Sequence, residues 1–370
     1  MLGEPNSLSN FLVEGELTIV RFPHMNAFKK LPIVDSALPN LLALNFQDIA
    51  NLVGKLGWSF YRTQQVLRWL YQHRTREIDS MSNLSKKDRD FLKTVATIIG
   101  IPAPTVMQSQ DGTRKLLFSL ENNLAIESVL IPYSKRLTLC ISVQVGCTVD
   151  CRFCLTGQMG LKRNLKAHEI VGQVMAAQDI LEEGERITSL VFMGRGEPLA
   201  NIDAVSEAVS RITNIQWGLG IPARRITIST VGLARRLKAL AGLGVNVAIS
   251  LNATTNEQRD ILMPMVNKLN PLPELLEACR TYPLDRGKRL TFEYVLLSGE
   301  NDSPEDAQRL TKLLRGMRCK INLIPFNEFP GSPFLRPSDR AIKDFQDCLL
   351  YTSDAADEGL GVDLGGRRII

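Results

Sequence analysis

Three of the seven cysteines lie within eight residues of one another, at Cys147, Cys151 and Cys154. Their spacing, C-x3-C-x2-C, brings three thiolates into one loop, and soft sulfur ligands are those that iron–sulfur clusters use. No fourth cysteine lies nearby, so a [4Fe-4S] cluster held by these residues would leave one iron open to a small molecule. The spacing therefore predicts a [4Fe-4S] cluster with one open ligand position.

Other interpretations also fit three clustered cysteines. Structural zinc sites normally have four ligands, and no histidine lies in or just after the loop, which disfavours a zinc knuckle. Three unrelated buried thiols are a second alternative. A plain electron carrier is a third; it is disfavoured because an open iron would be liable to oxidation, and because the glycine loop described next would then have no role.

A second candidate loop, residues 193–199, follows an apolar run and contains Gly196 and Glu197. Glycine lets the backbone approach a ligand closely, and a carboxylate can accept a hydrogen bond from an ammonium group. An ordinary tight turn is the alternative. Together with the cysteine spacing, this Gly-Glu-Pro element resembles the radical S-adenosylmethionine (SAM) superfamily. The resemblance implies that the SAM methionine chelates the open iron, that the Gly-Glu-Pro element binds its amino group, and that the reduced cluster cleaves SAM to a 5′-deoxyadenosyl radical.

Small polar residues mark the ends of further predicted strands. They are Ser229, then Ser250 with Leu251 and Asn252, and finally Asn327. Taken alone, such a residue more often caps a strand end than binds a ligand. Under the superfamily resemblance they would bind the ribose and methionine carboxylate of SAM, and Asn327 offers both a donor and an acceptor to adenine or ribose.

Alternating strands and helices must position these residues. The predicted strands are residues 137–145, 187–193, 225–230, 245–251, 290–297 and 319–325. Apolar strands separated by helical stretches indicate a parallel sheet wrapped by helices. Six such units are too few for a closed eightfold barrel, so we expect an α/β fold with a partial (βα)6 radical-SAM barrel. Barrels of this kind place their chemistry in the loops that follow the strands, where the candidate residues fall.

The rest of the chain is predicted to form smaller units. Residues 1–38 read as an irregular lead-in, 39–100 as a small helical domain, 101–136 as a connecting β-hairpin, and 137–349 as the radical SAM core. Basic residues of the helical domain could lie along RNA, although a solvated face explains any one of them equally well. Asp111-Gly112 is the hairpin signal, and a further strand, 125–131, is expected to end at Pro132.

Composition limits the compartment and the kinds of partner that the protein can have. The chain has 370 residues, a formal net charge of +5 and a sequence pI of about 8.8. This mildly basic balance is compatible with a nucleic-acid partner but is weak support for one. No apolar run approaches the ~20 residues that cross a bilayer, and Glu4, Glu14 and Glu16 interrupt any leader. Clustered free cysteines favour a reducing compartment, so we expect a cytoplasmic protein. We also expect a monomer without a membrane partner.

The combined motifs narrow the resemblance to one family. The run from Cys140 to Cys147, residues 161–165, and the Gly-Glu-Pro-Leu, Ser-Thr-x-Gly and Asn-Leu-Ile-Pro-Phe-Asn elements resemble the dual-specificity RNA adenine C2-methyltransferases, the RlmN family. Their relatives, the Cfr-type C8 methyltransferases, stay open as an alternative. The resemblance covers residues 44–349 and implies methylation of one adenosine in 23S rRNA and one in tRNA. It also implies two SAM molecules per turnover and an electron donor such as flavodoxin or ferredoxin.

Two more residues gain roles from this resemblance. Cys140 stands where the family keeps a non-ligand cysteine that resolves the covalent enzyme–RNA adduct through a disulfide. Glu127 stands where the family keeps the general base that removes the C2 proton. Composition alone would make them a buried strand cysteine and a solvent-facing strand glutamate.

The sequence departs from the family pattern after Leu350. The family carries the methyl group on a cysteine in a segment like Arg-Gly-x-x-x-x-Ala-Cys-Gly-Gln, and residues 350–370 contain neither that pattern nor a cysteine. Cys348 is the nearest candidate, well before the expected place. The glycine- and aspartate-rich tail reads as non-native and poorly ordered. The printed chain is therefore expected to cleave SAM without methylating RNA. Several turnovers of methylation on 23S rRNA fragments would contradict this expectation. An inactivated RNA-binding Fe–S protein is the alternative function that fits the missing cysteine.

Overall fold

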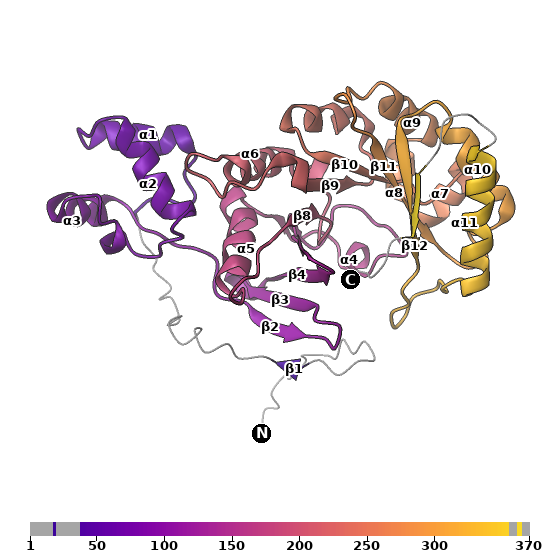
Figure 1. Cartoon of the computed structure of the whole chain (residues 1–370), viewed down its shortest axis with the longest axis horizontal. Coiled ribbons are helices and arrows are strands. Elements are labelled where there is room, and N and C mark those ends of the chain that lie inside the picture. Colours follow the sequence, from indigo (N-terminus) through magenta and orange to yellow (C-terminus); the bar gives the residue numbers. More distant parts are fainter. Residues whose placement is uncertain (1–17, 20–37, 355–360, 365–370) are drawn as a thin grey trace.

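The computed structural model of the chain describes residues 18–19, 38–354 and 361–364. A lobe of three α-helices, drawn in indigo and violet in Figure 1, forms one end of the molecule. These helices are α1 (Phe46–Lys55), α2 (Tyr61–Tyr71) and α3 (Lys86–Val95), with a 3-10 turn at Ile78–Ser80. Asn45 begins α1 because its side chain accepts from the Asp48 amide at 2.9 Å while the Asp48 carboxylate accepts from the Asn45 amide at 3.4 Å. Ile49 and Val53 form the buried face of this helix.

Arg211 fixes the helical lobe to the rest of the fold. It lies on α6 (Ile202–Thr213) and is 2% exposed. Its Nη1 donates to the Leu42 carbonyl at 2.7 Å and to the Tyr71 hydroxyl at 2.9 Å, and its Nε donates to Glu207 at 2.8 Å. A buried guanidinium needs such partners because an unpaired buried charge is strongly unfavourable. The lobe is therefore held by polar contacts as well as by apolar packing.

Replacing Arg211 with methionine is expected to lower the free energy of unfolding by about 2 kcal/mol or more, because two buried acceptors lose their donor. Urea denaturation measures the change. Arg286→Met is the matched control at an exposed arginine, where a shift of at most ~0.5 kcal/mol is expected. Equal losses in the two variants would show that Arg211 does not hold the lobe.

One sheet of eleven strands organises the remainder, in the order β1-β2-β3-β4-β5-β8-β9-β10-β11-β12-β13. The strands are β1 (Thr18–Ile19), β2 (Thr105–Gln108), β3 (Arg114–Ser119), β4 (Ala125–Tyr133), β5 (Arg136–Cys140), β8 (Ser189–Phe192), β9 (Ile226–Thr230), β10 (Asn246–Ser250), β11 (Leu290–Leu296), β12 (Cys319–Pro325) and β13 (Gly361–Leu364). Neighbours are antiparallel from β1 to β5 and parallel from β5 to β13. Among the described residues the sheet is open, which confirms the predicted partial α/β barrel.

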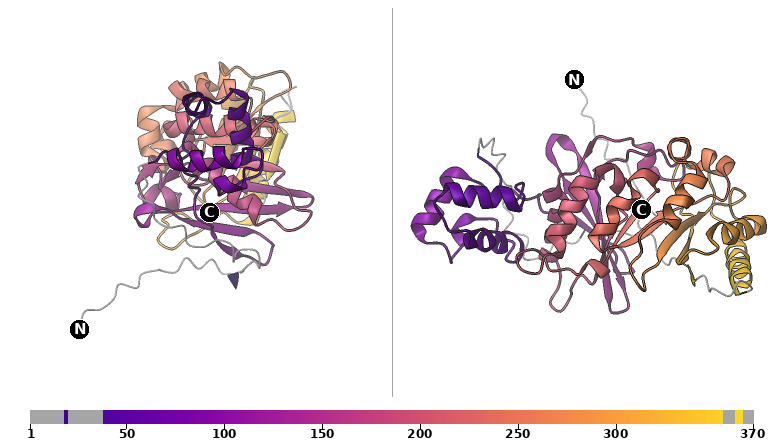
Figure 2. Two further views of the ribbon diagram at one scale, coloured as in Figure 1. Left: turned by 90° about the vertical axis from the view of Figure 1, so that its left-hand side faces the viewer. Right: turned by 90° about the horizontal axis from the view of Figure 1, so that it is seen from above.

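Helices connect the parallel strands and lie around the outside of the sheet, as Figures 1 and 2 show. Besides α6 they are α4 (Leu155–Gln158), α5 (Ala167–Asp179), α7 (Asn256–Leu262), α8 (Pro264–Leu269), α9 (Leu272–Arg280), α10 (Pro304–Leu314) and α11 (Asp339–Asp354). Short 3-10 segments lie at Glu121–Asn123, Pro198–Asn201, Ala223–Arg225 and Ala234–Leu243. The hairpin strands β2, β3 and β4 extend the same sheet. The five-part domain division stays a prediction.

The two faces of the sheet differ in character. In β9, Ile226 and Ile228 are buried whereas Thr227 and Ser229 are half-buried. Successive side chains of a strand point to opposite faces, so one face of the sheet packs on the helices and the other carries polar groups. We call the second one the inner face. It is where a polar ligand could be held.

Two predicted strand boundaries were wrong. The strand expected over 137–145 ends at Cys140, and Gln144–Val145 forms β6, which pairs with β7 (Arg163–Asn164) in a separate small sheet. The ladder is interrupted because the Ser142 amide donates to the Gln173 side chain at 2.9 Å. β4 does not end at Pro132 but continues to Tyr133. Its pairing with β3 stops at Leu130, so Pro132 stands where β4 has a partner on one side only, a place that tolerates proline.

The chain ends also differ from expectation where they are described. Poor order was expected over 350–370, but α11 runs on to Asp354 and β13 pairs with the edge of β12. The stretch 341–354 lacks glycine and proline, so nothing in it breaks a helix. Thr18–Ile19 form β1; residues 1–17, 20–37, 355–360 and 365–370 lie outside the described residues. In the described part of the chain, no helix has both the length and the apolar character to cross a membrane.

Candidate active site

The three clustered cysteines lie in a tightly folded loop between β6 and α4. Gly146, just before Cys147, has a φ of +79°, and a Cβ there would lie 1.8 Å from the carbonyl oxygen of Gly160. Only glycine fits this position, because the loop passes directly over the segment that leaves the site. The amide of Cys154 donates to the carbonyl of Cys151 at 3.0 Å, which closes the turn between the second and third thiols.

An apolar cluster encloses these thiols. Cys151 belongs to a second, smaller core with Val231, Met263 and Phe326, and the side chains of Cys147 and Cys154 pack against it. Its other members are Val149, Leu262, Val266, Leu297 and Phe334. This core lies beyond the carboxyl ends of β9, β11 and β12, where the loops of parallel strands meet.

The three thiols influence one another electrostatically. Burial, together with the nearby charge of Cys154, raises the pKa of Cys147 to about 12. Burial also raises the pKa of Cys151 well above its usual value, and the charges of both other cysteines add to this. In the described part of the chain, no group of three or more His, Cys, Asp or Glu side chains is already gathered around a metal position. Three mutually close thiols in an apolar pocket are nevertheless the donor set that suits an iron–sulfur cluster.

Arg259 of α7 is a charged residue beside this pocket that the sequence did not reveal. It is fully buried and donates to the carbonyls of Asn270 at 2.8 Å and Val231 at 3.1 Å, while its Nε has no hydrogen-bond partner among the residues that the structure describes. Burial lowers its pKa to about 10, and the nearby charge of Cys151 opposes this. A positive charge here favours thiolate over thiol.

Gln144 is a second residue that sequence reasoning missed, and it joins the two candidate loops. Its Oε1 accepts from the amide of Thr148 in the cysteine loop at 3.2 Å and from the amide of Glu197 at 2.9 Å. Its Nε2 donates to Thr148 and Asn164, both at 2.7 Å. A fully buried glutamine with four hydrogen bonds fixes the cysteine loop against the Gly-Glu-Pro loop. Its only signal in the sequence is a polar residue between two valines.

Glycine is required at position 196 because the backbone there passes very close to Gln144. Its φ is +102°, and a Cβ at this position would lie 2.5 Å from the Cβ and 2.8 Å from the backbone nitrogen of Gln144. Gly196→Ala is expected to reduce the free energy of unfolding by at least about 1–2 kcal/mol through backbone strain, and to weaken nucleoside binding as the two loops separate. Thermal melts and titration calorimetry measure both effects. Gly242→Ala is the control, because Gly242 has a negative φ and nothing lies within 4 Å of its Cβ position. Equal losses in the two variants would show that the close approach of Gly196 to Gln144 does not matter.

Glu197 is buried and already has three donors from the chain. Its Oε1 accepts from the Thr230 hydroxyl at 2.5 Å and the Leu199 amide at 2.9 Å, and its Oε2 accepts from the Val231 amide at 2.9 Å. Burial raises the pKa of Glu197 and these hydrogen bonds oppose the rise. A carboxylate has about four acceptor positions, so Oε2 can still take one further donor from a ligand.

Ser229 and Ser250 lie at the carboxyl ends of β9 and β10, and a third residue joins them. Glu293 of β11 is 8% exposed and its Oε2 accepts from the Ser229 hydroxyl at 3.0 Å. The Ser250 hydroxyl also hydrogen-bonds to this carboxylate, and burial raises the pKa of Glu293 above its usual value. Sequence reasoning missed Glu293. The signal was present, as a single acidic residue within the apolar run 290–297.

Three further predicted residues differ in exposure. Leu251 is fully buried and donates from its amide to the Glu293 carbonyl at 2.9 Å. Asn252 is buried with a φ of +56°, and its Oδ1 accepts from the Val295 amide at 2.8 Å, so its side chain is largely occupied in holding β11. A non-glycine residue with positive φ at a candidate site is typical of functional loops. Asn327 follows β12 and is exposed.

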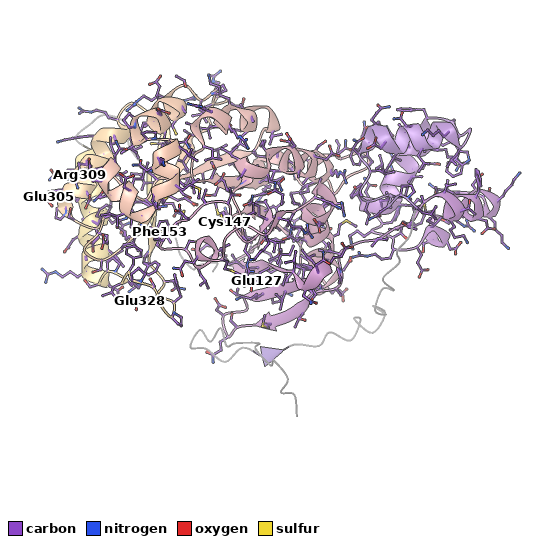
Figure 3. All side chains as sticks on the ribbon, turned by 180° about the vertical axis from the view of Figure 1, so that it is seen from behind. Glu127, Cys147, Phe153, Glu305, Arg309 and Glu328 are labelled. Carbon is purple, nitrogen blue, oxygen red and sulfur yellow. The ribbon has the colours of Figure 1, made fainter. Side chains whose placement is uncertain are left out.

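Glu127 and Cys140 lie on neighbouring antiparallel strands. Cys140 is paired in register with Val129, and Glu127, two residues earlier, points to the same face. Figure 3 shows Glu127 and Cys147 over the middle of the sheet, with Glu305 and Arg309 at the outer helices. Arg195, from the glycine loop, forms an ion pair with Glu127 at 3.1 Å. Cys140 is fully buried, and burial raises its pKa to about 12.

Cys348, the candidate methyl carrier, lies elsewhere. It belongs to α11, and its Sγ is 3.8 Å from the carbonyl of Pro304 at the start of α10. Both helices belong to the outer layer (Figure 1). This placement does not bring the thiol to the inner face.

Known proteins resemble this chain over both its helical lobe and its parallel sheet. Residues 141–311 match the radical SAM superfamily, and residues 39–98 match the ribosomal RNA large subunit methyltransferase N-terminal domain. A dual-specificity RNA methyltransferase RlmN of Syntrophus aciditrophicus is 46% identical over 312 residues, covering 84% of this chain and 89% of that protein. The RlmN of Desulfosudis oleivorans is 50% identical over 291 residues, 78% of each. A crystal structure of a radical SAM methyltransferase from Sphaerobacter thermophilus superposes with a TM-score of 0.80 at 39% identity, covering 89% of this chain and 96% of that one. The chain belongs to the radical SAM superfamily and, within it, to the RlmN family of dual-specificity RNA methyltransferases.

Proposed function

We propose that this chain carries the cluster, SAM and general-base groups of an enzyme that methylates carbon 2 of an adenine in 23S rRNA and of an adenine in tRNA. The methyl-carrying cysteine of the family is not present in residues 350–370, so the printed chain is expected to cleave SAM without completing the transfer. The observation that carries the proposal is the placement of two sets of groups on one side of one sheet. A thiol triad and the acceptors for SAM lie at the carboxyl ends of the parallel strands, and a glutamate and a further cysteine lie on the adjoining antiparallel strands.

The radical SAM family uses a [4Fe-4S] cluster and SAM. Cys147, Cys151 and Cys154 would hold the cluster, which supplies the electron that cleaves the SAM sulfonium. Glu197 and the Gly196 backbone would hold the SAM amino group. The remaining binding residues would be Ser229, Ser250, Leu251, Asn252 and Asn327, with two SAM molecules used per turnover.

Glu127 would act as the general base that takes the proton from C2. Its ion pair with Arg195 at 3.1 Å orients the carboxylate. The same contact would have to loosen before the carboxylate could hold a proton. An RNA phosphate is a suitable competitor for Arg195, because arginine binds phosphate and carboxylate through the same donors.

Cys140 would resolve the RNA adduct by attacking the sulfur of the family's methyl-carrying cysteine, so that the S–S bond forms as the S–CH2 bond to RNA breaks. The electron pair then passes to the methylene carbon, which takes a proton to become the methyl group; the partner cysteine is not present in residues 350–370. The burial and raised pKa of Cys140 keep it as a thiol in the free protein, and a thiol is a poor nucleophile. This state protects it from premature oxidation until the adduct is in place. Flavodoxin or ferredoxin would supply electrons, and the helical lobe would contact RNA, with the enzyme acting as a cytoplasmic monomer.

The test uses SAM with a deuterated methyl group, a reductant and fragments of 23S rRNA and tRNA. Products are identified by mass spectrometry and NMR. We expect 5′-deoxyadenosine in each case, and any transferred label on adenine C2. Label on C8 would favour the Cfr-type alternative. Label on a nitrogen or ribose oxygen would contradict the proposal, because those atoms are methylated without a radical.

A further inference from the structure

A polar cluster on the inner face joins three neighbouring parallel strands. Ser250 of β10 and Glu293 of β11 are paired in register, and Ser229 of β9 reaches the same carboxylate. Both serine hydroxyls hydrogen-bond to Glu293, and their oxygens lie 3.4 Å apart. The charge of Lys320 on β12 also acts on this carboxylate. A buried acidic group is thus surrounded by two hydroxyl donors.

Glu293 can take the protons of both hydroxyls, in place of a hydrogen bond from one serine to the other. A serine hydroxyl has one proton and two lone pairs, and an ionised carboxylate can only accept. When Ser229 and Ser250 both donate to Glu293, neither has a proton left for any other partner. Their free lone pairs can then only accept hydrogen bonds from a ligand.

We infer that Glu293 is a positioning residue that turns Ser229 and Ser250 into a pair of acceptors for the ribose hydroxyls of the nucleoside ligand. The inference rests on the proposed SAM binding and adds a residue and a specificity to it. It favours the ribose over the methionine carboxylate as the partner of these serines, because a carboxylate has no proton to donate to them.

Two neighbouring acceptors suit a vicinal diol better than an ammonium group. An ammonium is bound most strongly by a carboxylate in direct contact, and Glu197 offers one with an unused acceptor position. The Ser229–Ser250 pair presents neutral oxygens side by side, which match two neutral hydroxyl donors. The two buried carboxylates therefore take different parts of one ligand, one directly and the other through serines.

The experiment measures binding of S-adenosylhomocysteine, and of its counterpart lacking both ribose hydroxyls, to the cluster-loaded protein by anaerobic calorimetry. In Glu293→Gln the side-chain amide donates a hydrogen bond to one serine. The hydroxyl of that serine then accepts from the amide, and its own proton turns toward the ligand. We expect about tenfold weaker binding of the ribose ligand, and a change of less than about threefold for the dideoxy ligand. Thr291→Val, two residues earlier on the same face of β11, is the control and should leave both affinities unchanged.

A second variant avoids the buried carboxylate. Ser229→Ala should reduce the preference for the ribose ligand by about tenfold, and adding Glu293→Gln should reduce it little further. Equal weakening of both ligands by Glu293→Gln, or no weakening, would overturn the positioning role. Wild-type protein that binds both ligands equally would also overturn it. Wild-type protein that binds neither would instead contradict the proposed function itself.

Discussion

Replacing Cys151 with alanine is expected to remove the iron–sulfur cluster and with it all SAM cleavage. Cys151 is the most buried of the three thiols and lies within the apolar core that surrounds them. Two remaining thiolates cannot hold three irons of a cubane. The loss in reductive SAM cleavage should exceed the ~100-fold that changes in the groups around metal ligands typically cause. Iron and sulfide analysis after anaerobic reconstitution, with 5′-deoxyadenosine as the product, measures it.

Cys279→Ala provides the matched control. Cys279 is also a buried free cysteine, but it lies on α9 and belongs to the main core, not to the smaller core that encloses the three thiols. Its variant should lose some stability and keep the full iron content. Retention of the cluster in the Cys151 variant, or loss of iron in the Cys279 variant, would show that the cysteine loop is not the cluster site.

In a form of the protein completed with the methyl-carrying cysteine segment of the family, replacing Glu127 with glutamine is expected to reduce RNA methylation by roughly 10²–10⁴-fold while SAM cleavage continues, as for loss of a general base. The amide has the shape of the carboxylate but cannot take a proton. Because Glu127 lies on β4, outside the SAM-binding loops, affinity for SAM should stay unchanged. Quantifying methylated nucleoside and 5′-deoxyadenosine in the same reaction separates the two steps.

Glu121→Gln is the control for this prediction. Glu121 lies in the turn before β4 and is exposed, so its variant should behave as wild type in both assays. An equal fall of methylation and SAM cleavage in the Glu127 variant would indicate a binding or folding role. Unchanged methylation would rule out Glu127 as the base.

The sequence was sufficient for features that depend on spacing along the chain. The three cysteines, the Gly-Glu-Pro loop and six parallel strands are local patterns, and five of the strands lie close to their predicted bounds, whereas the first ends at Cys140. Features made by distant segments could not be read in this way. The Arg195–Glu127 ion pair joins residues 68 positions apart, and Gln144 meets Glu197 across 53. Such contacts depend on which strands become neighbours.

Glu293 is a residue whose type is evident from the sequence but whose partners are not. An acidic residue in an apolar strand is visible in the sequence, but its partners lie on two other strands. Only the parallel register of β9, β10 and β11 brings them together. The boundary at Pro132 was misjudged for a related reason, since a strand tolerates proline where the missing N–H would face no neighbouring strand, and β4 has lost one neighbour there.

The central claim is that three thiolates hold a cluster whose remaining iron binds SAM. The most direct measurement is electron paramagnetic resonance of the anaerobically reconstituted and reduced protein, before and after SAM is added. We predict a [4Fe-4S] signal that changes when SAM is added and that broadens when SAM carries a magnetic isotope in its amino or carboxylate group. A signal indifferent to SAM, or a cluster coordinated by four protein thiolates, would contradict the account.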